Sequence, residues 1–132
     1  MRSIQGILSL LLALLGGNAA AEWTAVRLGN DIYAAYADKA TIRAADGMVR
    51  MSGLYDFQKR DFTPGGLALF STVVLREYDC AGRRVRLLSL IDFSDHMGAG
   101  TAVATSTRPG RWENIVAESL DEAFLQVACG AN

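Results

Sequence analysis

Two thiols are the side chains of this chain most suited to react with each other. Cys80 ends a long apolar, β-branched run, and Cys129 ends the last helical pattern. The chain opens with an export signal, and thiols in oxidising compartments pair, so we expect a Cys80–Cys129 disulfide. Two unpaired buried thiols and a metal site are the alternatives, although a single histidine gives a metal few further ligands.

A second reactive-looking group lies between two predicted strands, where Asp92, Ser94, Asp95 and His96 follow one another closely. These are the residue types of a hydrolytic triad or of a weak divalent-cation site. Residues so close in sequence rarely reach the geometry in which a base activates a nucleophile. We therefore interpret the group as a polar turn, and predict no catalytic residue, no metal site and no cofactor.

Arg83, Arg84 and Arg86 form the one basic cluster, at the tip of a predicted hairpin. Exposed side chains at such tips often contact partners, so the three arginines are candidates for gripping an acidic or sulfated partner. The alternative is a solvated hairpin end whose charges keep sheet edges from pairing.

The first 21 residues have the features of a signal peptide. Arg2 precedes an apolar run from Ile7 to Leu15, and three alanines follow before Glu22. The run is shorter than the roughly 20 residues that span a bilayer, so we expect no stable membrane insertion after cleavage. No cysteine lies near the cleavage site, which argues against a lipoprotein. We expect an exported protein, periplasmic, secreted or at the cell surface.

Residues 22–132 have the length of one domain. Without Arg2 they contain 12 basic and 14 acidic residues, a balance that gives no reason to expect binding to nucleic acid. Alternating patterns predict strands near residues 22–28, 32–37, 48–57, 67–79, 83–93, 101–106 and 112–116. Residues 58–66 read as the longest loop. Tyr33 and Tyr36 should face opposite sides of their strand.

The hairpin of residues 67–93 is apolar on both sides. In regular alternation Val85, Leu87, Ser89, Ile91 and Phe93 share one side, while Leu88 and Leu90 face the other. A sheet exposed to water on one side would alternate more cleanly. One helix covers only one side of the hairpin. The other side is covered either by a second copy of the chain, in a homodimer, or by loops of the same chain.

The predicted C-terminal helix begins with a capping box, in which Ser119 accepts a backbone amide and Glu122 reaches back. Leu120, Phe124, Val127 and Ala128 give it one apolar stripe, and Gly130 suits its end. The pattern as a whole predicts an α+β fold: a single antiparallel sheet of about six strands, with this helix packed on one face and tied to the sheet by the disulfide.

Four segments together resemble the surface-adhesin protein E-like domain family. They read IYAAYADKATI, VRMSGLYDF, STVVLREYDCAGRRVRLLSLIDFSDHMGAG and RWENIVAESLDEAFLQVACG, in order over nearly the whole mature chain. The resemblance implies an antiparallel sheet and a C-terminal helix held by a disulfide. It also implies binding to host extracellular-matrix or serum proteins, with dimers among family members.

The function that these observations favour is protein binding without catalysis. The leading interpretation is an adhesin-like module that recognises other proteins. The alternative is a periplasmic accessory or inhibitor protein of the cell envelope, and an envelope enzyme ranks last.

Overall fold

The computed structural model describes residues 21–27 and 30–130. Residues 1–20 of the predicted signal peptide lie outside this range. Within it, no helix is both long and apolar enough to cross a membrane.

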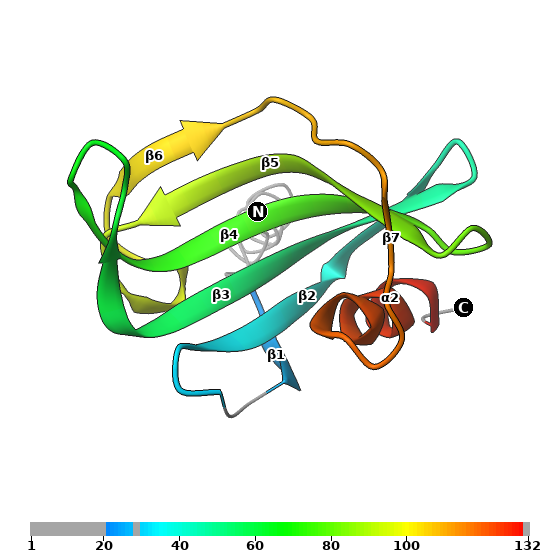
Figure 1. The fold of residues 1–132 in the computed structure, drawn as a ribbon, viewed down its shortest axis with the longest axis horizontal. Helices are drawn as coiled ribbons and strands as arrows, with labels where there is room; N and C mark the ends of the chain where they lie inside the picture. The colour runs from blue at the N-terminus through cyan, green and yellow to red at the C-terminus, as the bar shows by residue number, and fades with distance from the viewer. Residues whose placement is uncertain (1–20, 28–29, 131–132) are drawn as a thin grey trace, which may run out of the picture.

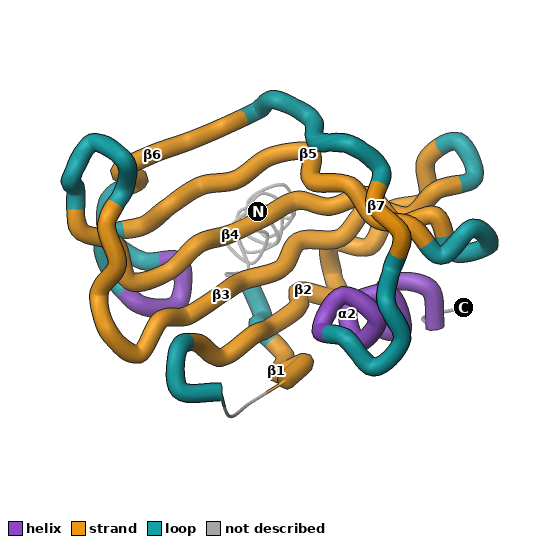
Figure 2. Tube along the Cα trace, viewed as in Figure 1, coloured by secondary structure: helices purple, strands orange, loops and turns teal. Residues whose placement is uncertain are grey.

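The described chain forms one antiparallel sheet and one α-helix, with a short 3₁₀ turn between two strands (Figures 1 and 2). The elements are β1 (Thr24–Arg27), β2 (Tyr33–Ala45), β3 (Met48–Phe62), β4 (Ala68–Asp79), β5 (Arg84–Phe93), η1 (His96–Gly98), β6 (Ala102–Ser106), β7 (Glu113–Asn114) and α2 (Leu120–Gly130). Strands β1 to β6 pair in chain order, and β7 pairs with β5 beyond the end of β6. The predicted α+β fold is confirmed, with seven strands.

The expected loop over residues 58–66 is wrong for its first half, because β3 continues to Phe62. After a bulge, Asp61 pairs with Leu69 and Phe62 with Ala68. The prediction was wrong because the charged side chains of this stretch are typical of a loop. Ladder hydrogen bonds come from the backbone, so a sheet end in solvent can carry charged side chains and remain a strand.

Strand β5 contains one residue more than the ladder needs. Arg76 pairs with Leu87 and Leu75 with Ser89, so Leu88 is a bulge. The bulge overturns the expected face assignment: Val85 and Leu87 lie on the α2 side, whereas Ser89, Ile91 and Phe93 lie on the reverse side. Regular alternation had placed all five together.

Helix α2 lies across one face of the sheet and closes the main core (Figure 1). Phe124, Leu125 and Ala128 are buried against Met51 and Tyr78. The predicted stripe is confirmed: Phe124 and Ala128 are buried, and Leu120 and Val127 are partly buried against the core. Leu125, outside the predicted stripe, is buried as well. Gly53 lets the ring of Phe124 approach β3, because a Cβ there would lie 3.1 Å from the ring.

The start of α2 is capped as the sequence predicts. The Ser119 hydroxyl accepts the Glu122 backbone N–H at 3.2 Å, and the Glu122 carboxylate reaches back to the N–H of Glu118 at 3.1 Å. Farther along, the Cys80–Cys129 disulfide joins the end of α2 to the residue that follows β4, with 5.8 Å between the two Cα atoms. The predicted cross-link between helix and sheet is therefore present.

The reverse face of the sheet is covered in part by η1. A Cβ on Gly98 would lie 3.3 Å from Val73 and 3.4 Å from Leu54, and Leu54 is fully buried. Ser71 fastens this segment by donating to the carbonyl of Asp95 and accepting from the N–H of Gly98. The second apolar side of the central hairpin thus finds part of its cover within the chain, as the loop alternative expected.

Candidate protein-binding face

Strand register places side chains from five strands in rows across the α2 side of the sheet. One row contains Ala35, Tyr55, Thr72, Asp92 and Ala104. The next contains Ala37, Gly53, Val74, Leu90 and Ser106. Helix α2 lies over the start of the second row, where Phe124 sits on Gly53, and Ala35, Thr72 and Val74 are also buried. We call the half-buried and exposed part of this side, around Tyr55, Leu90, Asp92 and Ser106, the open face.

Three aromatic rings line the open face where it meets the helix. The Tyr33 ring meets Tyr55 edge-on at 5.1 Å between centroids, and it meets Phe57 at 6.3 Å. Tyr55 in turn lies 6.0 Å from Phe124 of the core. All three rings are half-buried, so they present a rigid apolar surface that loses little freedom when a partner covers it.

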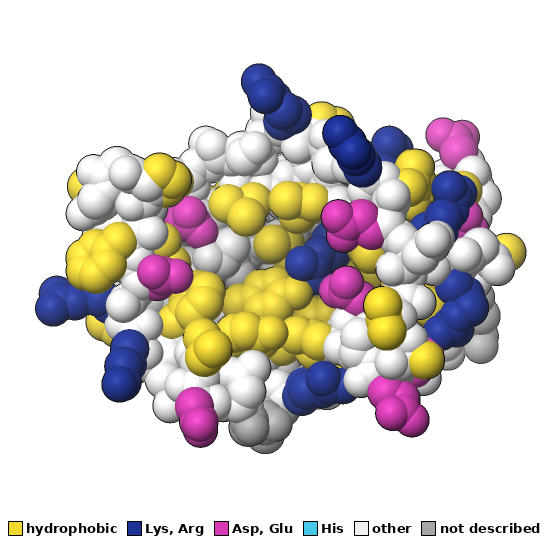
Figure 3. Space-filling view, in the orientation of Figure 1, with side chains coloured by type: hydrophobic (Ala, Val, Ile, Leu, Met, Phe, Trp, Pro, Cys, Tyr) yellow, Lys and Arg dark blue, Asp and Glu magenta, His cyan; other side chains and the backbone are white. Residues whose placement is uncertain are grey.

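Arg76 supplies a cation in the middle of this apolar surface. Its Nη1 donates to the Tyr55 hydroxyl at 2.6 Å, and its guanidinium lies 5.3 Å from the Tyr55 ring and 5.8 Å from the Phe124 ring. Asp121 at the start of α2 is 3.9 Å away. Figure 3, seen from the α2 side, shows apolar side chains across the middle of the molecule, with basic and acidic groups among them.

The pKa shifts of Arg76 and Tyr55 keep Arg76 positively charged and Tyr55 neutral. Burial acts to lower the pKa of Arg76, but the neighbouring Tyr55 and Tyr78 outweigh it and raise that pKa. Burial raises the pKa of Tyr55, so its hydroxyl stays neutral and accepts the Arg76 hydrogen bond. The open face therefore carries a permanent positive charge, held in place by rings.

A pocket of about 330 Å³ continues the open face beside Arg76. Its walls come from β5, from the connection between β6 and β7, and from the first turn of α2. Arg86 and Arg111 add two further cations, while Asp121 and Glu113 add acids. The arrangement suits a polar group of mixed charge at the rim of a larger contact.

The three arginines predicted to bind a partner all have acidic partners in this chain. Arg83, the most exposed, pairs with Glu122 of α2. Arg84 reaches Asp79 at 2.7 Å, and Arg86 reaches Glu77 at 2.7 Å. A role in binding an external partner stays a prediction for all three.

A charged network stabilises the reverse face at the same end. Glu77, only 4% exposed, accepts hydrogen bonds from Arg50 at 3.0 Å and Arg86 at 2.9 Å. Burial acts to raise the pKa of Glu77, but the two arginines outweigh it and lower that pKa. The Trp112 ring stacks on Arg86 at 4.8 Å and on Arg84 at 5.0 Å, which fixes the β6–β7 connection to the sheet.

The polar group between β5 and β6 is distributed among structural contacts. Asp92 accepts from Thr72 at 2.6 Å, and Ser94 accepts the N–H of Thr101 at 2.8 Å. His96 contacts Asp56 of β3 at 3.2 Å. The Ser94 and His96 contacts hold the turn that contains η1, whereas the Asp92 contact joins β4 and β5 on the other face of the sheet.

Comparison with known families decides what this sheet and helix belong to. The family model for surface-adhesin protein E matches residues 23–130, almost the whole described chain. The chain belongs to the surface-adhesin protein E family. No curated protein matches it.

Solved structures of Haemophilus influenzae protein E share the fold of this adhesin family member. One has a TM-score of 0.68 at 12% identity, covering 86% of this chain and 88% of the other. Its crystal form II gives 0.64 at 13% identity, covering 86% and 98%. At such identity the likeness shows the fold alone.

Sequence reasoning missed the part of this adhesin-family fold that offers a binding surface. Tyr55 and Arg76 were seen only as members of strand patterns. The available signal was Arg76 itself, the first charged residue after the uncharged run from Leu67 to Leu75. A charge at this point in a central strand needs a partner, and the register brings it to Tyr55.

Proposed function

We propose that this chain is an exported, non-catalytic adhesin-like protein that recognises other proteins through its open face. Membership of the surface-adhesin protein E family carries the adhesin-like part of this proposal. The open face supports the location, because α2 leaves Tyr33, Tyr55 and Phe57 half-exposed around Arg76.

The composition of the open face fits a protein partner. Aromatic side chains and arginine dominate binding energy at protein interfaces, because they bury much area at low entropic cost. Here the rings are held by one another and Arg76 is held by Tyr55, so the surface is organised before binding. We propose host extracellular-matrix or serum proteins as the partners.

A matched pair of neighbours on β6 tests the location. Ser106 pairs with Leu90 on the open face, whereas Thr105 pairs with Ile91 on the reverse face, and both are exposed. Ser106→Lys should weaken saturable binding to immobilised matrix or serum proteins about tenfold, equivalent to about 1.4 kcal/mol. Thr105→Lys should bind like wild type.

Two results would contradict the proposal. Absence of saturable binding to every matrix and serum protein at physiological salt would remove the adhesin function. If Ser106→Lys and Thr105→Lys weakened binding equally, the protein would still be a binding protein, but its binding site would not be the open face.

The compartment in which the protein works needs its own measurement. We propose that the protein is displayed at the cell surface or secreted, without a lipid anchor. Fractionation with protease shaving of intact cells should show an accessible pool. A protected pool, together with capture of a partner from the cell's own envelope, would favour a periplasmic accessory or inhibitor instead.

We also propose a homodimer in solution. Its support is that Leu75 and Ile91 stay half-exposed on the reverse face. Light scattering after size exclusion should give twice the monomer mass. A monomer mass at high protein concentration would contradict the homodimer.

Arg83, Arg84 and Arg86 remain predicted partner contacts. Arg83→Ala tests the most exposed of them in the binding assay with immobilised matrix or serum proteins.

A further inference from the structure

Two exposed large apolar side chains flank the β3–β4 hairpin, at the end of the molecule away from α2. Phe62, the last residue of β3, is 57% exposed, and Leu67, just before β4, is 53% exposed. Their connection lies at the upper left in Figure 1, whereas the turn before β2, with Ile32, lies at the lower left. We call Phe62 and Leu67 the apolar tip.

The hairpin that carries Phe62 and Leu67 is fixed by hydrogen bonds. The N–H of Thr63 donates to the carbonyl of Leu67 at 2.8 Å, and the N–H of Leu67 donates to the Thr63 hydroxyl at 3.1 Å. Gly66 closes the turn at a φ of 85°, a conformation that favours glycine. The chain therefore holds two large apolar side chains in water at a defined position.

Two exposed cations stand directly behind the apolar tip. Asp56 pairs with Ser71, and the next pair is Asp61 with Leu69. Four residues of β3 therefore lie opposite one residue of β4, and Lys59 and Arg60 belong to this bulged segment. The Arg60 guanidinium lies 6.0 Å from the Phe62 ring. Ahead of them, the run from Phe62 to Leu75 contains no charged residue.

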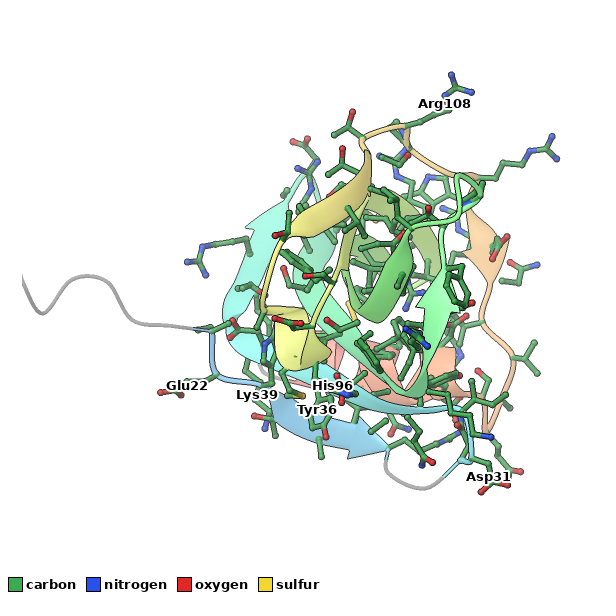
Figure 4. All side chains as sticks on the ribbon, turned by 90° about the vertical axis from the view of Figure 1, so that its left-hand side faces the viewer. Glu22, Asp31, Tyr36, Lys39, His96 and Arg108 are labelled. Carbon is green, nitrogen blue, oxygen red and sulfur yellow. A yellow bond between two sulfur atoms is a disulfide. The ribbon has the colours of Figure 1, made fainter. Side chains whose placement is uncertain are left out.

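Two acids share this end and limit its net charge. Asp61 accepts the N–H of Phe62 at 2.8 Å, which turns its carboxylate toward the hairpin backbone. Asp31 lines the same hollow as Ile32, Lys59 and Arg60. In Figure 4, which faces this end, Asp31 points outward at a lower corner, whereas Arg108 lies at the opposite edge. The local charges nearly balance.

We propose that the apolar tip inserts reversibly into the interface of a phospholipid bilayer, with Lys59 and Arg60 at the level of the phosphates. Protruding apolar side chains backed by long cationic ones match the polarity gradient of a bilayer surface. A protein partner more often needs a flat or hollow surface, which the open face provides. Contact through the tip would hold the molecule end-on and leave the open face free.

The primary test is sedimentation of the exported protein with sucrose-loaded vesicles. One set contains phosphatidylethanolamine and phosphatidylglycerol, and the other contains phosphatidylcholine alone. Wild type should sediment with both. Phe62→Ser and Leu67→Ser should each weaken partition about three- to tenfold, because each removes an apolar group that would enter the interface. Val116→Ser is the matched control, since Val116 is 71% exposed near α2.

A charge variant tests the second part of the contact. Lys59→Gln with Arg60→Gln should weaken partition onto the phosphatidylglycerol vesicles, with little effect on phosphatidylcholine. Because Asp31 and Asp61 balance these cations in wild type, the preference of wild type for anionic lipid should be modest. Equal loss on both vesicle types would assign Lys59 and Arg60 no electrostatic role and overturn their placement at the phosphates.

A depth measurement distinguishes insertion from adsorption. Phe62→Trp should gain a blue-shifted emission that brominated acyl chains quench beyond the quenching of Trp23 and Trp112 in wild type. No binding of wild type to either vesicle, or equal binding by wild type and the Phe62→Ser, Leu67→Ser double variant, would overturn the proposal. If the double variant lost binding to a protein ligand but not to vesicles, the tip would be a protein contact.

Discussion

Glu77 is the residue at which arginines from two neighbouring strands converge on one buried carboxylate. Arg50 and Arg86 both donate to it, and the pKa of Glu77 is lowered as a result. Glu77→Gln should reduce the free energy of unfolding at neutral pH by about 2 kcal/mol, because it replaces charge-assisted hydrogen bonds by neutral ones.

The pH dependence of this loss has a definite sign. A carboxyl group whose folded pKa is lowered stabilises the fold above its unfolded pKa, near 4.5 for glutamate, and loses that effect as pH falls through the folded value. The difference between wild type and Glu77→Gln in urea unfolding should therefore shrink below about pH 4. A constant difference from pH 7 to pH 3 would show that the carboxylate charge is not the cause.

Gly53 tests how tightly the helix is seated on the sheet. A Cβ at this position would lie 3.1 Å from Cε1 of Phe124, whose ring is fully buried. Gly53→Ala should destabilise the protein by about 1–3 kcal/mol, because the ring has little room to withdraw. Gly65→Ala is the control, since a Cβ there would meet its nearest neighbour, Thr63 Oγ1, at 3.8 Å. Equal thermal stability of the two variants would contradict this packing.

At the scale of elements, the disulfide joins α2 to the β4–β5 hairpin across 49 residues of sequence. Replacing both cysteines by alanine should cost about 4 kcal/mol, the loop-closure value for that length. Urea unfolding of wild type with and without reductant measures the same quantity. The double variant should be insensitive to reductant, and a wild type that is equally insensitive would mean that the bond adds nothing.

The elements that sequence predicted best are those whose signals are local. The Ser119 cap and the limits of β4 and β5 follow from residue type and short spacing. The bulge at Leu88 did not, because Leu87 and Leu88 are both apolar and either register gives an acceptable pattern. The extension of β3 through Lys59 and Arg60 was missed because charged residues resemble a loop.

The candidate site was less predictable than the fold. Which residues form the open face depends on how far α2 reaches across the sheet, and that is a property of tertiary packing. The arginine cluster illustrates the same limit: sequence shows three cations at a hairpin, but the register decides that Arg84 and Arg86 meet Asp79 and Glu77.

At the scale of the whole molecule, stability should be graded from the middle of the sheet to its edges. Strands β3 and β4 have a strand on each side, and α2 or η1 lies over them. Strand β6 pairs only with β5 among the described strands and is largely exposed. Amide hydrogens of Leu54 and Val74 should exchange at least about a hundredfold more slowly than those of Thr105 and Ser106. Similar rates would indicate a single cooperative opening.

The open face and the apolar tip are made of different residues, so their tests are independent. Variants of Ser106 act on protein binding, and variants of Phe62 or Leu67 act on vesicle partition. A protein that showed both would present its protein-binding surface at a set distance from a membrane.

The surplus residue at Leu88 gives β5 a place where chain length can vary during evolution. Removing it would join Leu87 to Ser89 in a regular ladder and leave each flanking side chain on its present side of the sheet. An insertion elsewhere in β5 would instead move every following side chain of the strand to the opposite face of the sheet. Alignments of distant family members should therefore concentrate single-codon gaps at this position and avoid them along the rest of the strand.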